Sequence, residues 1–489
     1  MATISSPGIG SSLDVASIVS KLMDAESAPL TQLQNKTSSY QAKLTSIGQL
    51  KSALSDLQVA AQTLNLSSTF SALTPSVSDS SVLSAAMTGA TPAGSYNIEV
   101  EQLAQAQKLT STVFEKQDSV VGNGTLTLDF GQYSDAGSPP VTFTANADNS
   151  TTTITIDSSN NTLTGIRDAI NKSGAPVTAT IINDGSGYRL SLTSKQSGTD
   201  NSIRLTVAES GTAGLSQLAY DGSDGGVANM TQNVAAADAK LKIDGIAVTK
   251  PSNTITDAIQ GVTLNLSKTT AAGETTKLTL TPDTDSVKTA LQSFVDAYNK
   301  LAQQISTSTA YDATTNTASV LTGDSTVRTV QSQIRNALAN AVSGAPAGMK
   351  TLSDIGISFQ DDGTLSLDSD KLDKVLADPT ADISKLFTTS ADGKTVGYGS
   401  RLNTLISGMI FGDDSLLNSR IDGINSTIKD LANQETDEQA RLDAIEQRYN
   451  TEFSALDTTI ASMTTTSTFL TQQLALIAAQ TPSTSSSSS

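Results

Sequence analysis

Apolar side chains near the end of the chain recur with the spacing of a helical seam. From Leu442 onward, successive apolar residues are three, four or seven positions apart, the a/d pattern of a coiled coil, with one stutter between Tyr449 and Phe453. No Pro interrupts this stretch before Pro482. The pattern therefore predicts one helix from Ser415 to Gln480, on the order of 100 Å long at about 1.5 Å per residue. Ser, Thr and Gln fill most other positions, so the helix needs a partner that covers its apolar stripe.

The start of the chain shows a seam of the same kind. Ser11 and Ser12 are candidate N-caps for a helix that begins near Leu13, Pro29 interrupts its stripe, and a longer stripe runs on to Leu64. We expect the two chain ends to pair, the alternative being two independent surface helices. The residues predicted to line the seam or to make oligomer contacts are Leu33, Tyr40, Leu44, Ile47, Leu54, Leu57, Leu64, Leu442, Ile445, Tyr449, Phe453, Leu456, Ile460, Met463, Leu470, Leu474 and Ile477.

The middle of the chain changes to a period of nearly two. Short Thr- and Val-rich runs bounded by Gly, Pro, Asn and Asp predict strands at 81–88, 94–101, 124–130 and 152–156. Two similar phrases, GIRDAIN near residue 165 and DAIQGVT near residue 257, each follow an Asn-Thr-[Leu/Ile]-Thr run. They predict two related modules with a short helix among strands, unless so short a match arose by chance.

Helical periodicity returns at Asp285, with stripes at 287–305 and 327–338 and a hairpin pattern at 355–367. The predicted fold class is α+β and multidomain, with a helical coiled-coil or bundle stalk built from both chain ends and inserted β-rich head domains. We expect terminal leg helices at 1–40 and 440–489 and a helical bundle domain at 41–70 and 285–439. A β-rich domain is expected at 71–115 and 232–284, and a second one at 116–231.

The amino-acid composition limits the kinds of binding and catalysis that we expect of the chain. The 489 residues include 30 Lys and Arg against 48 Asp and Glu, a net charge of −18, and no basic cluster, so we expect no nucleic-acid binding. Cys, His and Trp are absent, which removes zinc–thiolate sites and the commonest general base. The short apolar runs predict no membrane insertion, and Met1–Pro7 lacks the features of a secretory signal peptide.

The acidic loops lack the spacing of a metal or catalytic site. The run from Asp361 to Asp370 has neither calcium-loop spacing nor a Glu at the twelfth position, so a turn at Asp362–Gly363 and an N-cap at Ser369 are the simpler interpretation. Asp221–Gly226 resembles a calcium-binding repeat only in composition. The phosphate-binding loop and the nucleophile elbow do not occur, nor does a Ser-x-x-Lys motif in a fitting context. We therefore predict no enzyme activity, no metal site and no cofactor.

Several phrases, spread in order along the chain, resemble the flagellar filament cap proteins, a family of bacterial hook-associated proteins. They are SSPGIGSSLDVASIVSKLMDAESAPL at 5–30, GSYNIEVEQLAQAQKL at 94–109, the two Asn-Thr-[Leu/Ile]-Thr phrases, which resemble the hook IN repeat, and the runs at 362–379 and 447–474.

The resemblance implies a structural and assembly protein that caps the distal end of the filament and promotes flagellin folding and insertion. It implies a homo-oligomeric ring, with flagellin, the hook–filament junction protein and a flagellar export chaperone as partners. It also implies export through the flagellar type III apparatus to the filament tip, without a cleaved signal peptide. The first alternative is a bacterial surface adhesin with a β-rich binding head on a helical stalk. A hydrolase within the β-rich part, flagellin itself and a junction protein are further alternatives.

Overall fold

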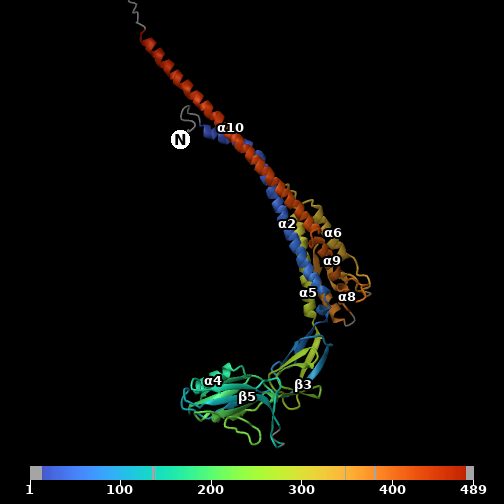
Figure 1. Ribbon diagram of the computed structural model, residues 1–489. Coiled ribbons are helices and arrows are strands. Elements are labelled where there is room, and N and C mark those ends of the chain that lie inside the picture. Colours follow the sequence, from blue (N-terminus) through green and yellow to red (C-terminus); the bar gives the residue numbers. More distant parts are fainter. Residues whose placement is uncertain (1–13, 135–136, 138, 347, 379–380, 481–489) are drawn as a thin grey trace, which may run out of the picture. The chain divides into compact units, whose positions relative to one another are not determined.

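The computed structural model describes residues 14–134, 137, 139–346, 348–378 and 381–480 (Figure 1). The chain forms two compact units: unit 1 comprises Met1–Thr69 and Asp285–Ser489, and unit 2 comprises Phe70–Thr284. Unit 1 is thus built from both ends of the chain, which confirms the predicted fold class. Leu13 and Pro482 lie outside the described residues.

Unit 1 is mainly helical. The predicted long final helix is confirmed, since α10 has 65 residues. The elements are α1 (Val15–Glu26), α2 (Ala28–Asn65), α5 (Thr284–Thr309), α6 (Ser325–Ala339), the 3-10 helix η3 (Leu352–Ile355), α7 (Ser369–Ala377), α8 (Ser384–Phe387), α9 (Tyr398–Ile410), α10 (Leu416–Gln480), and two hairpins, β17 (Tyr311–Asp312) with β18 (Thr317–Ala318) and β19 (Ile357–Phe359) with β20 (Leu365–Leu367). A short helix, α3 (Ser67–Ser71), spans the point where the chain passes from unit 1 into unit 2.

Local capping explains where the first helices begin. Asp14 caps α1, because its Oδ1 accepts a hydrogen bond from the Ser17 N–H at 3.0 Å. The N-cap predicted at Ser11–Ser12 is therefore wrong; those residues lie outside the described part of the chain. Pro29 stands in the first turn of α2, where its missing N–H costs no hydrogen bond.

The core of unit 1 lies along the second half of α2. That half packs on α9 and on the first turns of α10, while α6 and α8 pack on α9. Burial of a Leu or Ile side chain is worth about 1.5–3 kcal/mol, so this apolar face holds the bundle together. The buried residues of α2 are Ile47, Leu50, Ala53, Leu54, Leu57, Gln58, Ala61 and Leu64.

Unit 2 consists of β-sheets around two apolar cores. One core lies in the sheet ordered β1-β16-β3-β12-β13 and the sheet β14-β15-β2; the other lies in the sheets β10-β5-β6, with β7 on β5, and β11-β4-β9-β8, together with helix α4. The elements are β1 (Leu73–Val77), β2 (Leu83–Met87), β3 (Gly94–Gln102), β4 (Lys108–Thr110), β5 (Gly124–Tyr133), β6 (Phe143–Ala145), β7 (Thr152–Ile156), α4 (Leu163–Lys172), β8 (Val177–Asn183), β9 (Tyr188–Ser194), η1 (Thr199–Asn201), β10 (Ser202–Glu209), η2 (Leu215–Leu218), β11 (Thr231–Val234), β12 (Ala239–Ile243), β13 (Ile246–Lys250), β14 (Thr254–Ile259), β15 (Val262–Leu266) and β16 (Thr276–Pro282). The finer division into four domains stays a prediction.

The two similar phrases fold differently. In the first, Thr162 caps α4 by accepting from the Gly165 N–H at 3.1 Å, and one face of α4 is buried. In the second, the predicted helix is wrong, because the segment is strand β14, which pairs antiparallel with β15. Ile255 and Ile259 are buried there, and the Thr254 hydroxyl bonds Asn265 on the neighbouring strand instead of capping a helix. Pairing with the neighbouring strand, and not the local sequence pattern, therefore determines the conformation of the second phrase.

Candidate functional site

A narrow helical leg extends from the bundle of unit 1, and we define it as residues 15–46 and 432–478. In it α1 and the first half of α2 pack along α10 (Figure 1). The Thr37 hydroxyl donates to the Glu435 carboxylate, and the Arg441 guanidinium lies 3.4 Å from a Glu26 carboxylate oxygen. The predicted pairing of the chain ends is therefore observed as direct contact. Exposed ion pairs of this kind contribute only about 0–1 kcal/mol each, so they align the helices more than they bind them.

Two polar clusters hold the helices of the bundle together. The Gln58 side chain, only 4% exposed, donates from Nε2 to Asn403 Oδ1 at 2.9 Å and to Ser407 Oγ at 2.8 Å, which joins α2 to α9. Asp324, the N-cap of α6, lies 2.8 Å from Arg420 Nη2 on α10. Buried polar groups cost free energy unless they are paired, so each cluster fixes one register between helices.

The charge of Asp324 is stabilised in the folded chain. Burial by itself raises the pKa of this carboxyl group. The hydrogen bond and charge of Arg420, together with the Thr326 and Val327 N–H groups, outweigh that effect and bring the pKa below its usual value. Asp324 is therefore ionised at neutral pH and serves at once as a helix cap and as an ion-pair partner.

The predicted seam residues fall into three classes along the leg. Those within the bundle, and Leu442 at 3% exposure, are buried, whereas Leu456 is already 45% exposed. Coverage of the seam therefore decreases along α10. The buried class is Ile47, Leu54, Leu57, Leu64 and Leu442; the half-buried class is Leu33, Tyr40, Leu44, Ile445, Tyr449, Phe453 and Ile460; the exposed class is Leu456, Met463, Leu470, Leu474 and Ile477. Whether these residues make oligomer contacts stays a prediction.

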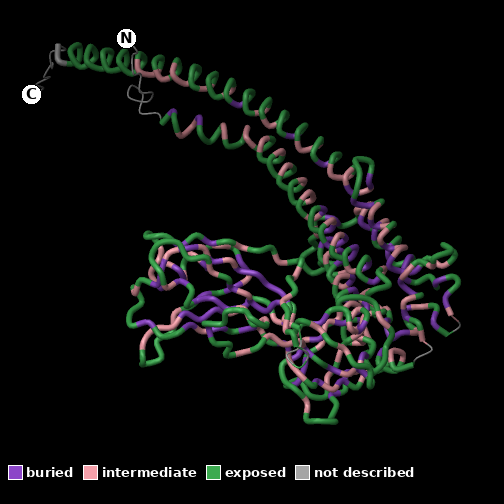
Figure 2. Tube along the Cα trace, turned by 60° about the horizontal axis from the view of Figure 1, so that its bottom comes forward, coloured by how far each residue is buried: buried purple, intermediate pink, exposed green. Residues whose placement is uncertain are grey.

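The last part of α10 has no covering helix among the described residues. We call residues 462–478 the tip; Figure 1 shows α10 continuing past the level of α1, and Figure 2 shows the tip as exposed. Met463 and Leu474 are each 65% exposed, and Phe469 is 57% exposed. Large apolar side chains exposed together on one segment mark a contact surface.

Sequence reasoning missed the polar clusters. Gln58 follows Leu54 by four positions and so shares its helix face, which was the available signal. Nothing in the spacing of Asp324 and Arg420, which lie 96 positions apart, indicates that they meet.

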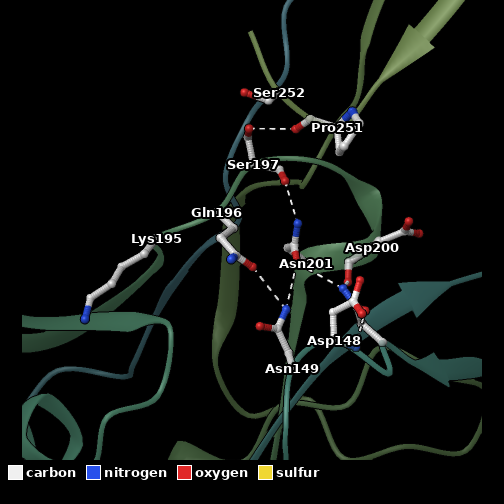
Figure 3. A pocket seen from close by; sticks show the side chains of 10 residues that line it. Asp148, Asn149, Lys195, Gln196, Ser197, Asp200, Asn201, Pro251 and Ser252 are labelled. Atoms are coloured by element: carbon white, nitrogen blue, oxygen red, sulfur yellow. Dashed lines mark hydrogen bonds between the residues drawn. The ribbon is translucent and has the colours of Figure 1, made fainter. Parts of the chain in front are cut away.

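Unit 2 contains a polar pocket of about 510 Å³, lined by loops around residues 146–149, 195–201 and 251–252 (Figure 3). Asn201 is buried at its centre. Its Oδ1 accepts from Asn149 Nδ2 at 3.0 Å, and its Nδ2 donates to the Ser197 carbonyl oxygen at 2.7 Å. The Ser197 hydroxyl in turn donates to the Pro251 carbonyl oxygen at 2.7 Å. The observed bonds join the loops to one another, which is a structural role.

The acidic loops form turns and caps in the structure. Asp362 Oδ1 accepts from the Thr364 N–H at 2.9 Å and from its hydroxyl at 2.6 Å, the bonding of a tight Asx turn. The cap predicted at Ser369 is wrong by one position, because Asp368 accepts from the Lys371 N–H at 3.0 Å. Within the described ranges, no three Asp, Glu, His or Cys side chains are grouped to hold a metal ion. Nor does any helix in those ranges have the length and apolar character needed to cross a bilayer.

Sequence profiles of known families match most of the chain. The profile of the flagellar hook-associated protein 2 N-terminus matches residues 11–107, and that of its C-terminus matches residues 236–465. The flagellin hook IN motif matches residues 140–196, which include the first of the two similar phrases.

Full-length relatives agree with these profiles. Flagellar hook-associated protein 2 of Escherichia coli K12 is 38% identical over 97% of this chain and 98% of its own length. The chain belongs to the flagellar hook-associated protein 2 family. Its Salmonella typhimurium member is 36% identical over 97% of this chain and 98% of its own length. The fold is also similar to a crystal structure of the D1-D2-D3 domains of the flagellar cap protein FliD from Escherichia coli. The match has a TM-score of 0.62 at 36% identity, and it covers 78% of this chain and 99% of the chain in the crystal structure.

Proposed function

We propose that the chain caps the distal end of the bacterial flagellar filament and promotes flagellin folding and insertion. The observation that carries this proposal is the full-length similarity to flagellar hook-associated protein 2, together with the similarity of fold to a flagellar cap protein. None of the relatives named above is described as an adhesin, so they give that alternative no support. We assign the chain a structural role and no catalytic one.

We further propose that several copies form a closed ring and that the leg of each copy contacts the filament. A ring whose copy number differs from that of the filament's protofilaments leaves unequal gaps at the filament end, and a new flagellin subunit enters through one of them. Weakly held legs suit this function, because each must release and rebind as the filament grows. The polar leg, with its thin apolar seam, has that character.

We propose the same partners and location that the family resemblance implies. The partners are flagellin, the hook–filament junction protein and a flagellar export chaperone. The route is export through the flagellar type III apparatus, without a cleaved signal peptide, to the filament tip. A pull-down from cell extract with the purified chain tests the chaperone and junction partners separately from the capping function.

The decisive experiment deletes residues 456–477 in the bacterium that carries the gene. We expect a soluble, folded chain that is exported but cannot cap, so the cells shed flagellin monomer into the medium and are non-motile. The wild-type chain expressed from the same plasmid is the control, and an immunoblot of the medium separates failed capping from failed export. Normal filaments on the deletion strain would contradict a role for the leg.

A further inference from the structure

Strand β13 (Ile246–Lys250) forms one edge of the five-stranded sheet of unit 2. It makes a hairpin with β12 across a two-residue turn, Asp244–Gly245, whose φ angles are 48° and 83°. In such a hairpin the pair of Ile243 and Ile246, and every second pair after it, exchanges both backbone hydrogen bonds. The backbone groups of Ala247 and Thr249 therefore point out of the sheet.

These outward groups have no bonding partner within the described part of the chain. No hydrogen bond joins the N–H or the carbonyl oxygen of Ala247 or Thr249 to another described residue, and both residues are exposed. Each of the two residues can therefore donate one hydrogen bond and accept one. The register of β13 with β12 is also regular, without the bulge that often disrupts an edge.

Other edge strands of unit 2 are protected in ways that β13 is not. Pro75, which has no N–H, stands in the middle of β1. In β8 the Asn171 side chain bonds the N–H of Ala179 at 2.9 Å and its carbonyl oxygen at 2.8 Å. In β10 Leu205 exchanges both backbone hydrogen bonds with Tyr220, each at 2.8 Å. The described chain gives β13 no comparable cover, so its edge is open to a further strand.

The side chains of β13 suit an uncharged and partly apolar strand. Val248 packs against the core of this sheet and is half-buried, and Ile246, on the same face, is 70% exposed. An added strand with apolar side chains at every second position would cover both. The one charged residue of β13 is Lys250, whose Nζ lies 2.6 Å from an Asp257 carboxylate oxygen, so the edge carries no unpaired charge.

We propose that β13 binds an extended, unfolded polypeptide segment by strand addition, through backbone hydrogen bonds to Ala247 and Thr249. This inference rests on the proposed function, in which the unfolded chain that reaches this protein is flagellin. Backbone bonding favours an extended segment over a folded one, because the backbone groups of a folded chain are already paired. β13 thus holds flagellin segments before they fold and releases them as their backbone groups pair within flagellin.

A second copy of this chain is a poorer occupant of the edge. The strand has five residues, so contact along it covers a strip about 17 Å long and about 5 Å wide, far less than the roughly 1,200–2,000 Å² of a stable interface between proteins. Pairing of two β13 edges with each other is also two-fold symmetric. Such pairing closes at two copies and does not build the proposed ring.

The test measures binding of the full-length chain, by fluorescence anisotropy, to short overlapping peptides that cover flagellin of the same bacterium. Thr249→Pro removes an outward N–H and leaves the bonds to β12 in place. It should weaken binding of the strongest peptides by about fivefold or more. Thr249→Val keeps the backbone groups and the strand propensity, so this matched control should bind as the wild type does.

Methylated peptides supply a second measurement that does not depend on how a variant folds. The strongest peptide is made in two versions, N-methylated at its odd or at its even positions. A strand added to β13 turns every second N–H towards it. One version should therefore bind nearly as the unmodified peptide does, and the other about fivefold or more weakly. Equal binding of the two versions overturns strand addition.

The outcomes separate the two proposals. Normal filaments on a strain that lacks the gene refute the proposed function itself. If no flagellin peptide binds, or if Thr249→Pro binds every peptide as the wild type does, the β13 site is overturned while capping stands. A dimer of the chain that Thr249→Pro abolishes, without peptide binding, overturns it in favour of a second copy.

Discussion

The ion pair that joins α6 to α10 offers a quantitative test of how the leg is anchored. In Asp324→Ala, α6 loses its N-cap bonds to Thr326 N–H at 2.8 Å and Val327 N–H at 3.3 Å, a change that costs about 1 kcal/mol. Arg420 loses its partner at 2.8 Å, and its Nε is already buried without a hydrogen bond. Because Arg420 keeps 37% side-chain exposure, we assign this loss only about 1 kcal/mol more. The expected total is about 2 kcal/mol.

Substitution by Asn separates the two contributions. The Asn side chain retains an oxygen that can cap α6, so Asp324→Asn should cost only the ion pair, about 1 kcal/mol. In a double-mutant cycle that combines Asp324→Asn with Arg420→Met, the coupling free energy between positions 324 and 420 should then equal the cost of Asp324→Asn alone, about 1 kcal/mol.

The contribution of the ion pair should also depend on pH with a definite sign. The pKa of Asp324 is lowered in the folded chain, so the folded state binds fewer protons than the unfolded state as the group titrates. The stabilisation is therefore fully present above the ordinary pKa of the carboxyl group and is lost as the pH falls through the lower, folded value. The difference in unfolding free energy between the wild type and Asp324→Asn should shrink from pH 7 towards pH 3.

Urea unfolding followed by far-ultraviolet circular dichroism provides the assay, because the signal at 222 nm reports mainly on the helices of unit 1. The wild type, the two Asp324 variants, the Arg420 variant and the double variants are compared at pH 7 and at low pH. Equal unfolding free energies for Asp324→Ala and the wild type would refute the combined cap and ion-pair role. A difference between the wild type and Asp324→Asn that persists unchanged at low pH would refute the electrostatic part.

Three further outcomes are expected. Leu54→Ala, at a fully buried site, should lower the free energy of unfolding by about 2–5 kcal/mol, whereas Leu474→Ala should leave the free energy of unfolding of the separate chain unchanged. Equal effects of the two substitutions in urea unfolding would contradict the decrease of coverage along α10. Cysteines replacing Thr37 and Glu435, which are in hydrogen-bond contact, should be joined by a short bis-maleimide within one chain at nanomolar concentration; purely intermolecular products on a denaturing gel would disprove the pairing of the chain ends. Asn201→Ala should destabilise unit 2 by about 1–3 kcal/mol in thermal unfolding, because the half-buried Asn149 side chain and Ser197 carbonyl oxygen lose their hydrogen bonds to Asn201. An unchanged midpoint would exclude the proposed tie between loops.

Periodicity was sufficient for the long helices and many of the strands. The seam from Leu442 to Ile477 has helical spacing whatever covers it, so α10 could be predicted from the sequence. The strands predicted at 81–88, 94–101, 124–130 and 152–156 correspond to β2, β3, β5 and β7. Caps were harder to place, because Asp14 follows Ser11 and Ser12 closely, Asp368 is next to Ser369, and both Asp and Ser are good caps. The choice among them depends on backbone angles that spacing does not specify.

The similar phrases show the limit of local reasoning. Both follow an Asn-Thr run, and only the first is helical, because the second joins a three-stranded sheet: β14 pairs with β15, and β15 pairs in turn with β2 from far earlier in the chain. The same limit applies to the two polar clusters of the helical bundle. Gln58 meets Asn403 and Asp324 meets Arg420 only after the helices have packed, since each contact joins residues many positions apart.

The sequence by itself determined the helical ends, the β-rich middle and the family resemblance, since each of these is a local or compositional property. Only the tertiary structure decided which part of the seam is covered within one chain. Leu442 is buried because α1 and α2 lie along that part of α10, whereas Leu470, with the same seam spacing, is 54% exposed because no helix of the described residues, α1 included, extends that far. Identical spacing thus gives a structural contact at one position and a free surface at the other. The physical reason is that burial depends on where the partner helix ends, and a stripe of apolar residues carries no information about the length of its partner.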